Sequence, residues 1–300
     1  NSGSEANEVA VLLSKQKTGR SIVVASNLAH SSVSYAAKKF GSKIESFDVD
    51  QKTFQVSNKD LIEFLKKQGK RVAMLNVVYG TTQLGTSEDF ILDKQVQKLC
   101  KKQGIWVHID AAFGALYLNN GIVPKQWRAA FALADSVTVD AYKMAGLPTS
   151  GALFLKHDSY KALLDQEVTY FKGTTTALGT TRSVLSVATS LDLFKKLKAA
   201  GLRKLAQEQN RKADYVRREL TKQGKELFVD DGSIIVVIKV SNEKILDQKL
   251  RSLKKKGFDL SSVKMQTSRY SLYGLRLTLT TKPETNWATI KKFVIACKTI

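Results

Sequence analysis

The segment ADSVTVDAYKMAGLPTSGALFL, residues 134–155, places a single lysine between two apolar runs. The runs, residues 136–139 and 151–155, are rich in β-branched and aliphatic side chains and predict two buried strands. Lys143 lies in the loop between them, a few residues from a glycine and a proline. Because nearly all the other basic residues follow solvated helical patterns, the position of this lysine needs a chemical reason.

Helix and strand patterns alternate through the segments that precede this lysine. We expect helices at 5–16, 31–40, 59–68 and 89–103, and strands at 21–25, 43–47, 72–78, 105–109, 136–139 and 152–155. Strands that read as nearly continuous apolar runs between helices predict an α/β fold with a mostly parallel sheet and helices on both faces. In such sheets ligands bind at the carboxyl ends of the strands.

The second half of the chain has a different pattern. A loop at 165–180 precedes a long helix at 181–223, which we expect to bend near Gly201. Strands at 234–240 and 275–280 and helices at 242–256 and 284–298 then predict a smaller α+β domain. We therefore expect a large domain over residues 1–200 and a small C-terminal domain over residues 201–300.

The composition is that of a globular protein. Of the 300 residues, 43% are hydrophobic and 25% are charged, and no apolar stretch approaches the length of a membrane span. Cys100 and Cys297 lie far apart on helical patterns, which indicates a reducing compartment without a disulfide framework. We therefore expect a cytoplasmic protein with no membrane partner.

The formal net charge of +21 could attract nucleic acid, anionic lipid or acidic metabolites. The basic residues, however, are dispersed as short lysine runs on polar helix faces. The sequence has no Arg/Gly tract, no aromatic RNA-binding motif and no Cys/His zinc spacing. A lysine-rich solvated surface is the favoured interpretation, and we expect neither a nucleic-acid partner nor a metal site.

Small residues lead directly into the first helix. Ser2, Gly3 and Ser4 precede the apolar helical pattern. The free backbone N–H groups at a helix N-terminus, with the helix dipole behind them, form a site for a phosphate. A simple N-cap explains the same residues equally well.

Other strand ends also carry polar residues that have two interpretations. Asp110 ends an apolar strand, where it is either a helix cap or a buried carboxylate that needs a partner. His30 precedes a helix and is either a cap, a core histidine or a site residue. Thr81 and Thr82 follow another strand, in a turn that would itself explain the two hydroxyls.

Together these residues match what pyridoxal 5'-phosphate requires. The cofactor's aldehyde needs a lysine amine for a Schiff base, which Lys143 would supply. Its pyridine nitrogen needs a carboxylate so that the ring acts as an electron sink, a role for Asp110. Ala112 would leave room beneath the ring, and His30 would stack on the opposite face.

At these residues the chain resembles the group II pyridoxal-phosphate-dependent amino-acid decarboxylases of fold type I, and most closely their archaeal tyrosine/aspartate branch. The motifs occur in the family's order and spacing over essentially the whole chain. They are SGSEAN, HSSVSYAAKKFG, GTTQLG, HIDAAFGA, DAYKMAGLP, TTTALGTTRSV and YGLRLTLT.

The resemblance implies a fold-type I architecture, with residues 1–200 as a cofactor-binding domain that lacks its N-terminal part. It also implies the following cofactor-binding residues: Ser2, Gly3, Ser4, His30, Thr82, Asp110, Ala112, Tyr142 and Lys143. The hydroxyl of Thr82 would lie near the cofactor's phenolic oxygen.

The resemblance further assigns catalytic roles to Lys143, His30, Asp110 and Tyr170. Tyr170 matches a mobile-loop tyrosine that protonates the decarboxylated carbon, and His30 would also orient the substrate. Arg276 matches a small-domain arginine that receives the substrate's carboxylate through a bidentate pair.

Three features depart from the family pattern. Tyr142 stands where a histidine usually precedes the lysine, and a tyrosine can hydrogen-bond a phosphate but cannot become cationic. Thr180 and Val184 stand where glycines are usual, so that loop should be stiffer. The chain begins inside the phosphate-binding motif, whereas homologues carry a further N-terminal segment that contributes to dimer contacts and to the substrate pocket.

The function that the resemblance implies is decarboxylation of an L-amino acid of the tyrosine, aspartate or glutamate type by a homodimer. Three alternatives stay open. One is a carbon–carbon lyase of the sphingosine-phosphate lyase type, and another is a truncated, weakly active homologue. The third, a cysteine desulfurase, is disfavoured because that chemistry needs a mobile-loop cysteine, and both cysteines lie on helical patterns.

Overall fold

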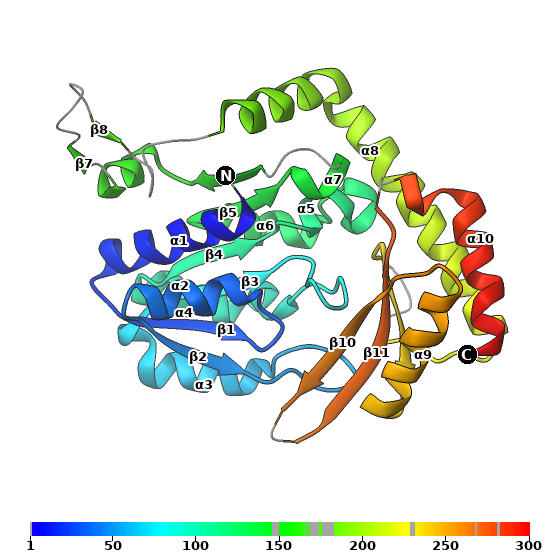
Figure 1. Ribbon diagram of the computed structural model, residues 1–300. Helices are drawn as coiled ribbons and strands as arrows, with labels where there is room; N and C mark the ends of the chain where they lie inside the picture. Colours follow the sequence, from blue (N-terminus) through cyan, green and yellow to red (C-terminus); the bar gives the residue numbers. More distant parts are fainter. Residues whose placement is uncertain are drawn as a thin grey trace.

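The computed structural model describes residues 2–145, 150–164, 166–167, 174–175, 183–228, 232–267, 269–280 and 283–300. A six-stranded sheet, with strand order β2-β1-β3-β4-β5-β6, forms its centre (Figure 1). Its strands are β1 (Ile22–Ser26), β2 (Lys43–Phe47), β3 (Val72–Val78), β4 (Trp106–Asp110), β5 (Ser136–Asp140) and β6 (Gly151–Leu155). The first five are parallel, and β6 pairs antiparallel with β5 at the edge. The predicted mostly parallel sheet is confirmed.

Helices cover both faces of this sheet, as predicted. The helices of the large sheet are α1 (Gly3–Thr18), α2 (Ser31–Lys39), α3 (Asn58–Gln68), α4 (Lys94–Gln103), α5 (Gly114–Tyr117), α6 (Lys125–Leu133) and α7 (Tyr142–Ala145). Successive strand residues point to opposite faces. Thus Val23, Met74 and Trp106 pack with α1 and α2, while Val24, Leu75 and Val107 pack with α3 and α4. Burial on both faces explains why β1, β3 and β4 read as nearly continuous apolar runs rather than as alternating patterns.

A second, antiparallel sheet with strand order β10-β11-β9 lies toward the C-terminus (Figure 1). It consists of β9 (Ile235–Val240), β10 (Ser261–Gln266) and β11 (Ser271–Thr278), with α9 (Glu243–Lys255) and α10 (Trp287–Ala296) beside it. The short strands β7 (Gln166–Glu167) and β8 (Thr174–Thr175) pair separately. The smaller α+β region is therefore present, although β10 was not among the predicted strands.

The long helix α8 (Val184–Lys222) connects the regions of the two sheets (Figure 1). Its backbone leaves the helical conformation at Lys198, where φ is 49° and ψ is −175°. The predicted bend therefore exists, but it lies three residues before Gly201 and on a lysine. Gly201 itself stays helical, and a Cβ added there would lie 3.0 Å from the Leu197 Cβ. None of the described helices is both long and apolar enough to cross a membrane.

Candidate active site

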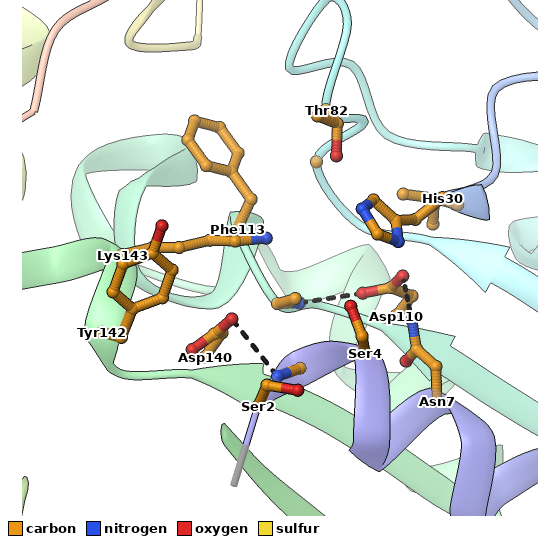
Figure 2. A pocket seen from close by; sticks show the side chains of 14 residues that line it. Ser2, Ser4, Asn7, His30, Thr82, Asp110, Phe113, Asp140, Tyr142 and Lys143 are labelled. Carbon is orange, nitrogen blue, oxygen red and sulfur yellow. Dashed lines mark hydrogen bonds between the residues drawn. The ribbon is translucent and has the colours of Figure 1, made fainter. Parts of the chain in front are cut away.

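The carboxyl ends of the parallel strands surround a cavity of about 320 Å³ (Figure 2). All of the predicted cofactor-binding residues line it. The full lining is Ser2, Gly3, Ser4, Asn7, His30, Val78, Gly80, Thr82, Asp110, Ala112, Phe113, Asp140, Tyr142 and Lys143. Residues separated by more than a hundred positions in the sequence thus meet at one edge of the sheet, as the topology of a parallel sheet requires.

The N-terminus of α1 forms one wall. Ser2 is the N-cap, and its Oγ accepts a hydrogen bond from the Glu5 backbone N–H at 3.1 Å. A Cβ added at Gly3 would lie 2.9 Å from Asp140 Oδ2 and 3.3 Å from the Ala112 Cβ, so a larger residue there would have to displace the Asp140 carboxylate. The cap therefore coexists with a helix N-terminus that faces the cavity and suits an anion.

Asp110 ends β4 and is only 4% exposed. Its Oδ1 accepts a hydrogen bond from the Ala112 backbone N–H at 3.1 Å, and its Oδ2 accepts one from Asn7 Nδ2 at 2.8 Å. These two donors compensate for much of the cost of burying the carboxylate. Both oxygens have further lone pairs, so Asp110 can accept another N–H from a ligand in the cavity.

His30 is the N-cap of α2, and its Nδ1 accepts a hydrogen bond from the Ser32 backbone N–H at 3.2 Å. The predicted cap is therefore present, and the ring also lines the cavity, so capping does not exclude a role in the site. Burial lowers the pKa of His30, and the charge of Lys143 lowers it further, while the charges of Asp110 and Asp140 raise it. On balance the neutral imidazole is favoured.

Lys143 follows β5 on the short helix α7 and enters the cavity from the side opposite His30 (Figure 2). Its backbone carbonyl accepts a hydrogen bond from the Tyr117 hydroxyl at 2.7 Å, which fixes the chain at this residue. Nearby, Asp140 accepts a long hydrogen bond from the Gly3 N–H at 3.3 Å. Burial raises the pKa of Asp140, and the charge of Lys143 counteracts this rise.

These residues fit pyridoxal phosphate. An amine and a buried carboxylate line the same cavity, a helix N-terminus lies between them, and the small side chain of Ala112 lies at its wall. Lys143 would hold the aldehyde carbon, Asp110 the ring nitrogen and the start of α1 the phosphate. Gly3 packs closely against Asp140 and Ala112, so the start of α1 lies directly at the wall of the cavity.

The two remaining predicted site residues are Arg276 and Tyr170. Arg276 lines a second cavity of about 470 Å³ beside α10, where its Nη1 donates to Ser261 Oγ at 3.2 Å. Its Nε has no hydrogen-bond partner among the described residues, and burial lowers its pKa. Tyr170 lies outside the described residues.

Several lining residues were not anticipated from the sequence. Asp140 ends β5 and could have been found by the same strand-end rule that identified Asp110. Asn7 lies one helical turn after Gly3, so its position on the sheet-facing side of α1 follows from helical spacing. Phe113 carried no comparable signal, because an apolar residue after a strand usually belongs to the core.

Glu88 is a buried carboxylate behind the cavity, with no exposed surface. Its Oε1 accepts a hydrogen bond from Ser26 Oγ, and its Oε2 accepts one from the Val78 N–H at 2.7 Å. Burial raises the pKa of Glu88 to about 7, well above the usual range of a glutamate, and the charge of Asp110 contributes to the rise. Folding therefore favours the protonated form.

We expect Glu88→Gln to remove part of the pH dependence of stability. Because its pKa is raised in the folded protein, Glu88 makes its full contribution to the free energy of unfolding below about pH 4.5. This contribution is lost as the pH rises to about 7. The loss is on the order of 3 kcal/mol. Glutamine can accept from Val78 and donate to Ser26, so the variant should match the parent's free energy of unfolding at pH 5 and exceed it at pH 8.

Urea unfolding at the two pH values measures this difference. Glu63→Gln is the control, because Glu63 is an exposed residue on α3 whose loss should have no such pH dependence. A Glu88→Gln effect of the same size at pH 5 and pH 8 would contradict the raised pKa.

Comparison with known proteins agrees with this site. A family model described as "Pyridoxal-dependent decarboxylase conserved domain" matches residues 6–239. An L-tyrosine/L-aspartate decarboxylase of Methanocaldococcus jannaschii is 30% identical over 186 residues, which cover 58% of this chain and 45% of that protein. A probable L-tyrosine/L-aspartate decarboxylase of Methanococcus maripaludis is 25% identical over 83% of this chain and 67% of its own length. The chain thus spans less than half of the first relative.

Solved structures show the same fold. A glutamate decarboxylase of Lactobacillus brevis superimposes with a TM-score of 0.84 at 16% identity, covering 99% of this chain and 72% of that one. A sphingosine-1-phosphate lyase of Burkholderia pseudomallei gives a TM-score of 0.80 at 16% identity, with 98% and 67% covered. The fold is that of the fold-type I pyridoxal-phosphate enzymes. Since the family match extends over most of the chain and includes all the cavity's residues from Ala6 onward, the chain belongs to the pyridoxal-dependent decarboxylase family, whose cofactor is pyridoxal 5'-phosphate.

Proposed function

We propose that this chain carries the catalytic centre of an enzyme that decarboxylates an L-amino acid of the tyrosine, aspartate or glutamate type, with release of the amine and CO₂. The observation that supports this most strongly is the single cavity that Lys143 and Asp110 both line, with His30 and the start of α1 beside them. The names of the relatives support tyrosine or aspartate as substrate, and the Lactobacillus brevis enzyme supports glutamate.

Each residue has a defined task in this proposal. When bound, the cofactor supplies an electron sink for the electron pair left behind by CO₂. Lys143 Nζ would hold the cofactor's aldehyde carbon. Asp110 would accept a hydrogen bond from the protonated ring nitrogen and keep that proton in place. His30 would cover the ring and orient the substrate.

The bond that breaks is selected by orientation. The bond from Cα to the carboxylate must stand perpendicular to the cofactor ring, so the cavity walls choose the reaction by how they hold the substrate. From the resemblance we propose Tyr170 as the acid that returns a proton to Cα. Arg276 is proposed as a carboxylate-binding residue on the resemblance alone, since its guanidinium lines the separate cavity beside α10.

The test is to incubate the purified, cofactor-loaded protein with tyrosine, aspartate, glutamate and related acids. We expect CO₂ and the corresponding amine in equal amounts from at least one of them. Aldehyde release from a phosphorylated amino alcohol without CO₂ would instead identify a carbon–carbon lyase. Cofactor binding without turnover of any substrate would identify a weakened homologue, an alternative that Tyr142 motivates.

We also propose that the active form is a homodimer in the cytoplasm. Large apolar side chains are exposed on the first turns of α8 and on β6, and they would be covered by a second copy of the chain. They are Val184, Leu185, Val187, Leu191 and Phe154. Cys100 and Cys297 are both free and buried, which is compatible with a reducing compartment.

A further inference from the structure

A chain of buried hydrogen bonds runs behind the cavity and includes residues to which the proposed function gives no task. Trp106 Nε1 donates to Ser136 Oγ at 2.8 Å, and Ser136 Oγ lies 2.8 Å from His108 Nδ1. His108 Nε2 in turn lies 3.1 Å from Asn7 Oδ1. None of these four side chains is more than 2% exposed, so solvent does not compete for these hydrogen bonds.

At Asn7 this series of hydrogen bonds branches, with one branch to Asp110 and the other, through Ser32, to His30. Asn7 Nδ2 donates to Asp110 Oδ2 at 2.8 Å and to Ser32 Oγ at 3.0 Å. Ser32 Oγ lies 2.8 Å from His30 Nδ1. Figure 2 shows Asn7 beside Asp110, on the side away from Lys143. A single amide thus connects the carboxylate and the imidazole that face the cavity.

Trp106, at one end of the series, determines which atom donates in each of the following hydrogen bonds. An indole N–H can only donate, so Ser136 Oγ accepts from Trp106 and has its own proton free for His108 Nδ1. A neutral His108 then carries its proton on Nε2. It donates that proton to Asn7 Oδ1, and Thr138 Oγ1, 3.4 Å away, is a weaker second acceptor.

The groups at the other end require the same direction. An ionised carboxylate can only accept, so the NH₂ group of Asn7 must face Asp110 and its oxygen must face His108. A backbone N–H can only donate, so the bond from Ser32 N–H makes His30 Nδ1 an acceptor. The proton of neutral His30 is therefore on Nε2. Two independent arguments thus agree on one arrangement.

The electrostatics of His108 favour the neutral ring that this arrangement requires. Burial lowers the pKa of His108 to about 4, against a rise caused by the charge of Asp110 and by a hydrogen bond to the Ser136 backbone, so the ring is neutral at neutral pH. A cationic ring would carry protons on both nitrogens. Its Nδ1–H could then not accept the proton of Ser136 Oγ, as the arrangement of hydrogen bonds requires.

We infer that Asn7 and His108 are positioning residues that hold the Asp110 carboxylate in place and, through Ser32 Oγ, support the neutral Nε2–H tautomer of His30 that the Ser32 N–H already favours. The catalytic use of that tautomer rests on the proposed function, whereas the hydrogen-bond arrangement itself does not. The cavity is thereby built with an acceptor at one wall and an N–H donor at another before any ligand arrives, which avoids reorganisation during turnover.

Nitrogen NMR of the cofactor-loaded protein with ¹⁵N-labelled histidine tests this inference, and the chain has only three histidines to assign. We expect His30 and His108 both to be neutral at pH 7.5, each with its proton on Nε2. A proton on Nδ1 of either ring would overturn the inference, and this readout needs no variant.

Asn7→Ala tests the positioning role. We expect the His30 nitrogen resonances to shift, because Ser32 Oγ loses the hydrogen bond from Asn7 Nδ2, while the Ser32 N–H keeps the His30 proton on Nε2. We expect kcat to fall by about 10- to 100-fold with KM unchanged. Asn210→Ala is the matched control, because Asn210 is also buried and also donates two hydrogen bonds, to the carbonyls of Tyr117 and Ala206. A His30 spectrum in Asn7→Ala identical to that of the control would refute the role.

His108→Gln provides a rescue. Glutamine offers one acceptor and one donor, so it can replace both hydrogen bonds of the neutral ring, whereas His108→Leu can replace neither. We expect the glutamine variant to keep more of the parent's kcat than the leucine variant. Correct tautomers in a protein without decarboxylase activity would leave this inference intact and refute only the proposed function.

Discussion

Lys143→Ala is expected to abolish both covalent attachment of the cofactor and decarboxylation. Lys143 is the lysine that lines the cavity, and an alanine there leaves no amine to react with the aldehyde. The rate should fall by more than about 10³-fold, as when a nucleophile is removed from other enzymes. The measurement is intact mass after borohydride reduction, together with the visible absorbance of the bound cofactor.

The parent protein should gain one reduced cofactor per chain in that experiment, and Lys143→Ala should gain none. Lys161→Ala is a suitable control, because Lys161 is an exposed lysine that pairs with Asp158 away from the cavity. If the Lys143→Ala protein were still labelled to the parent's extent, another lysine would be the attachment site and the present assignment would be wrong.

Asp110→Ala should separate catalysis from cofactor binding. The carboxylate stabilises the protonated ring nitrogen, which matters most when the ring takes up the electron pair during CO₂ loss. We expect kcat to fall by about 10³-fold, because this electrostatic contribution is needed in the transition state, while the cofactor Kd changes by less than about tenfold. Single-turnover CO₂ release and a cofactor titration measure the two quantities.

Asp110→Asn is the matched variant for this prediction. An asparagine keeps the shape of the side chain and one acceptor for the Ala112 or Asn7 N–H, but it carries no charge. We expect it to be nearly as inactive as the alanine variant and more stable. Decarboxylation by either variant at the parent's rate would disprove the electron-sink role of Asp110.

Much of the fold could be predicted because strands buried on both faces appear in the sequence as nearly continuous apolar runs. β2 and β3 begin and end at the predicted residues, β5 and β6 differ by one residue at one end, and β1 and β4 are shifted by one residue at both ends. β10 was missed because its buried Val263 and Met265 alternate with exposed polar residues, so it lacks a continuous apolar run. The bend of α8 was misplaced because backbone strain at Lys198 has no signature in residue type.

The residues of the candidate site that lie at the carboxyl ends of parallel strands could be predicted, because ligands bind there in such sheets. Asp110 and Thr82 follow parallel strands, and Lys143 lies just beyond β5, so the topology alone brings them together. Arg276 is on the second sheet, and its distance from the cavity depends on how the two sheets pack, which no local pattern encodes. The role of Asn7 became visible only from its hydrogen bonds to residues distant in the sequence.

The most direct test of the assignment is a crystal structure of the protein with pyridoxal phosphate bound. We predict continuous density from Lys143 Nζ to the aldehyde carbon, with the ring nitrogen within hydrogen-bond distance of an Asp110 carboxylate oxygen and the phosphate at the start of α1. A cofactor that bound elsewhere, or whose ring could reach only one of these two side chains, would contradict it.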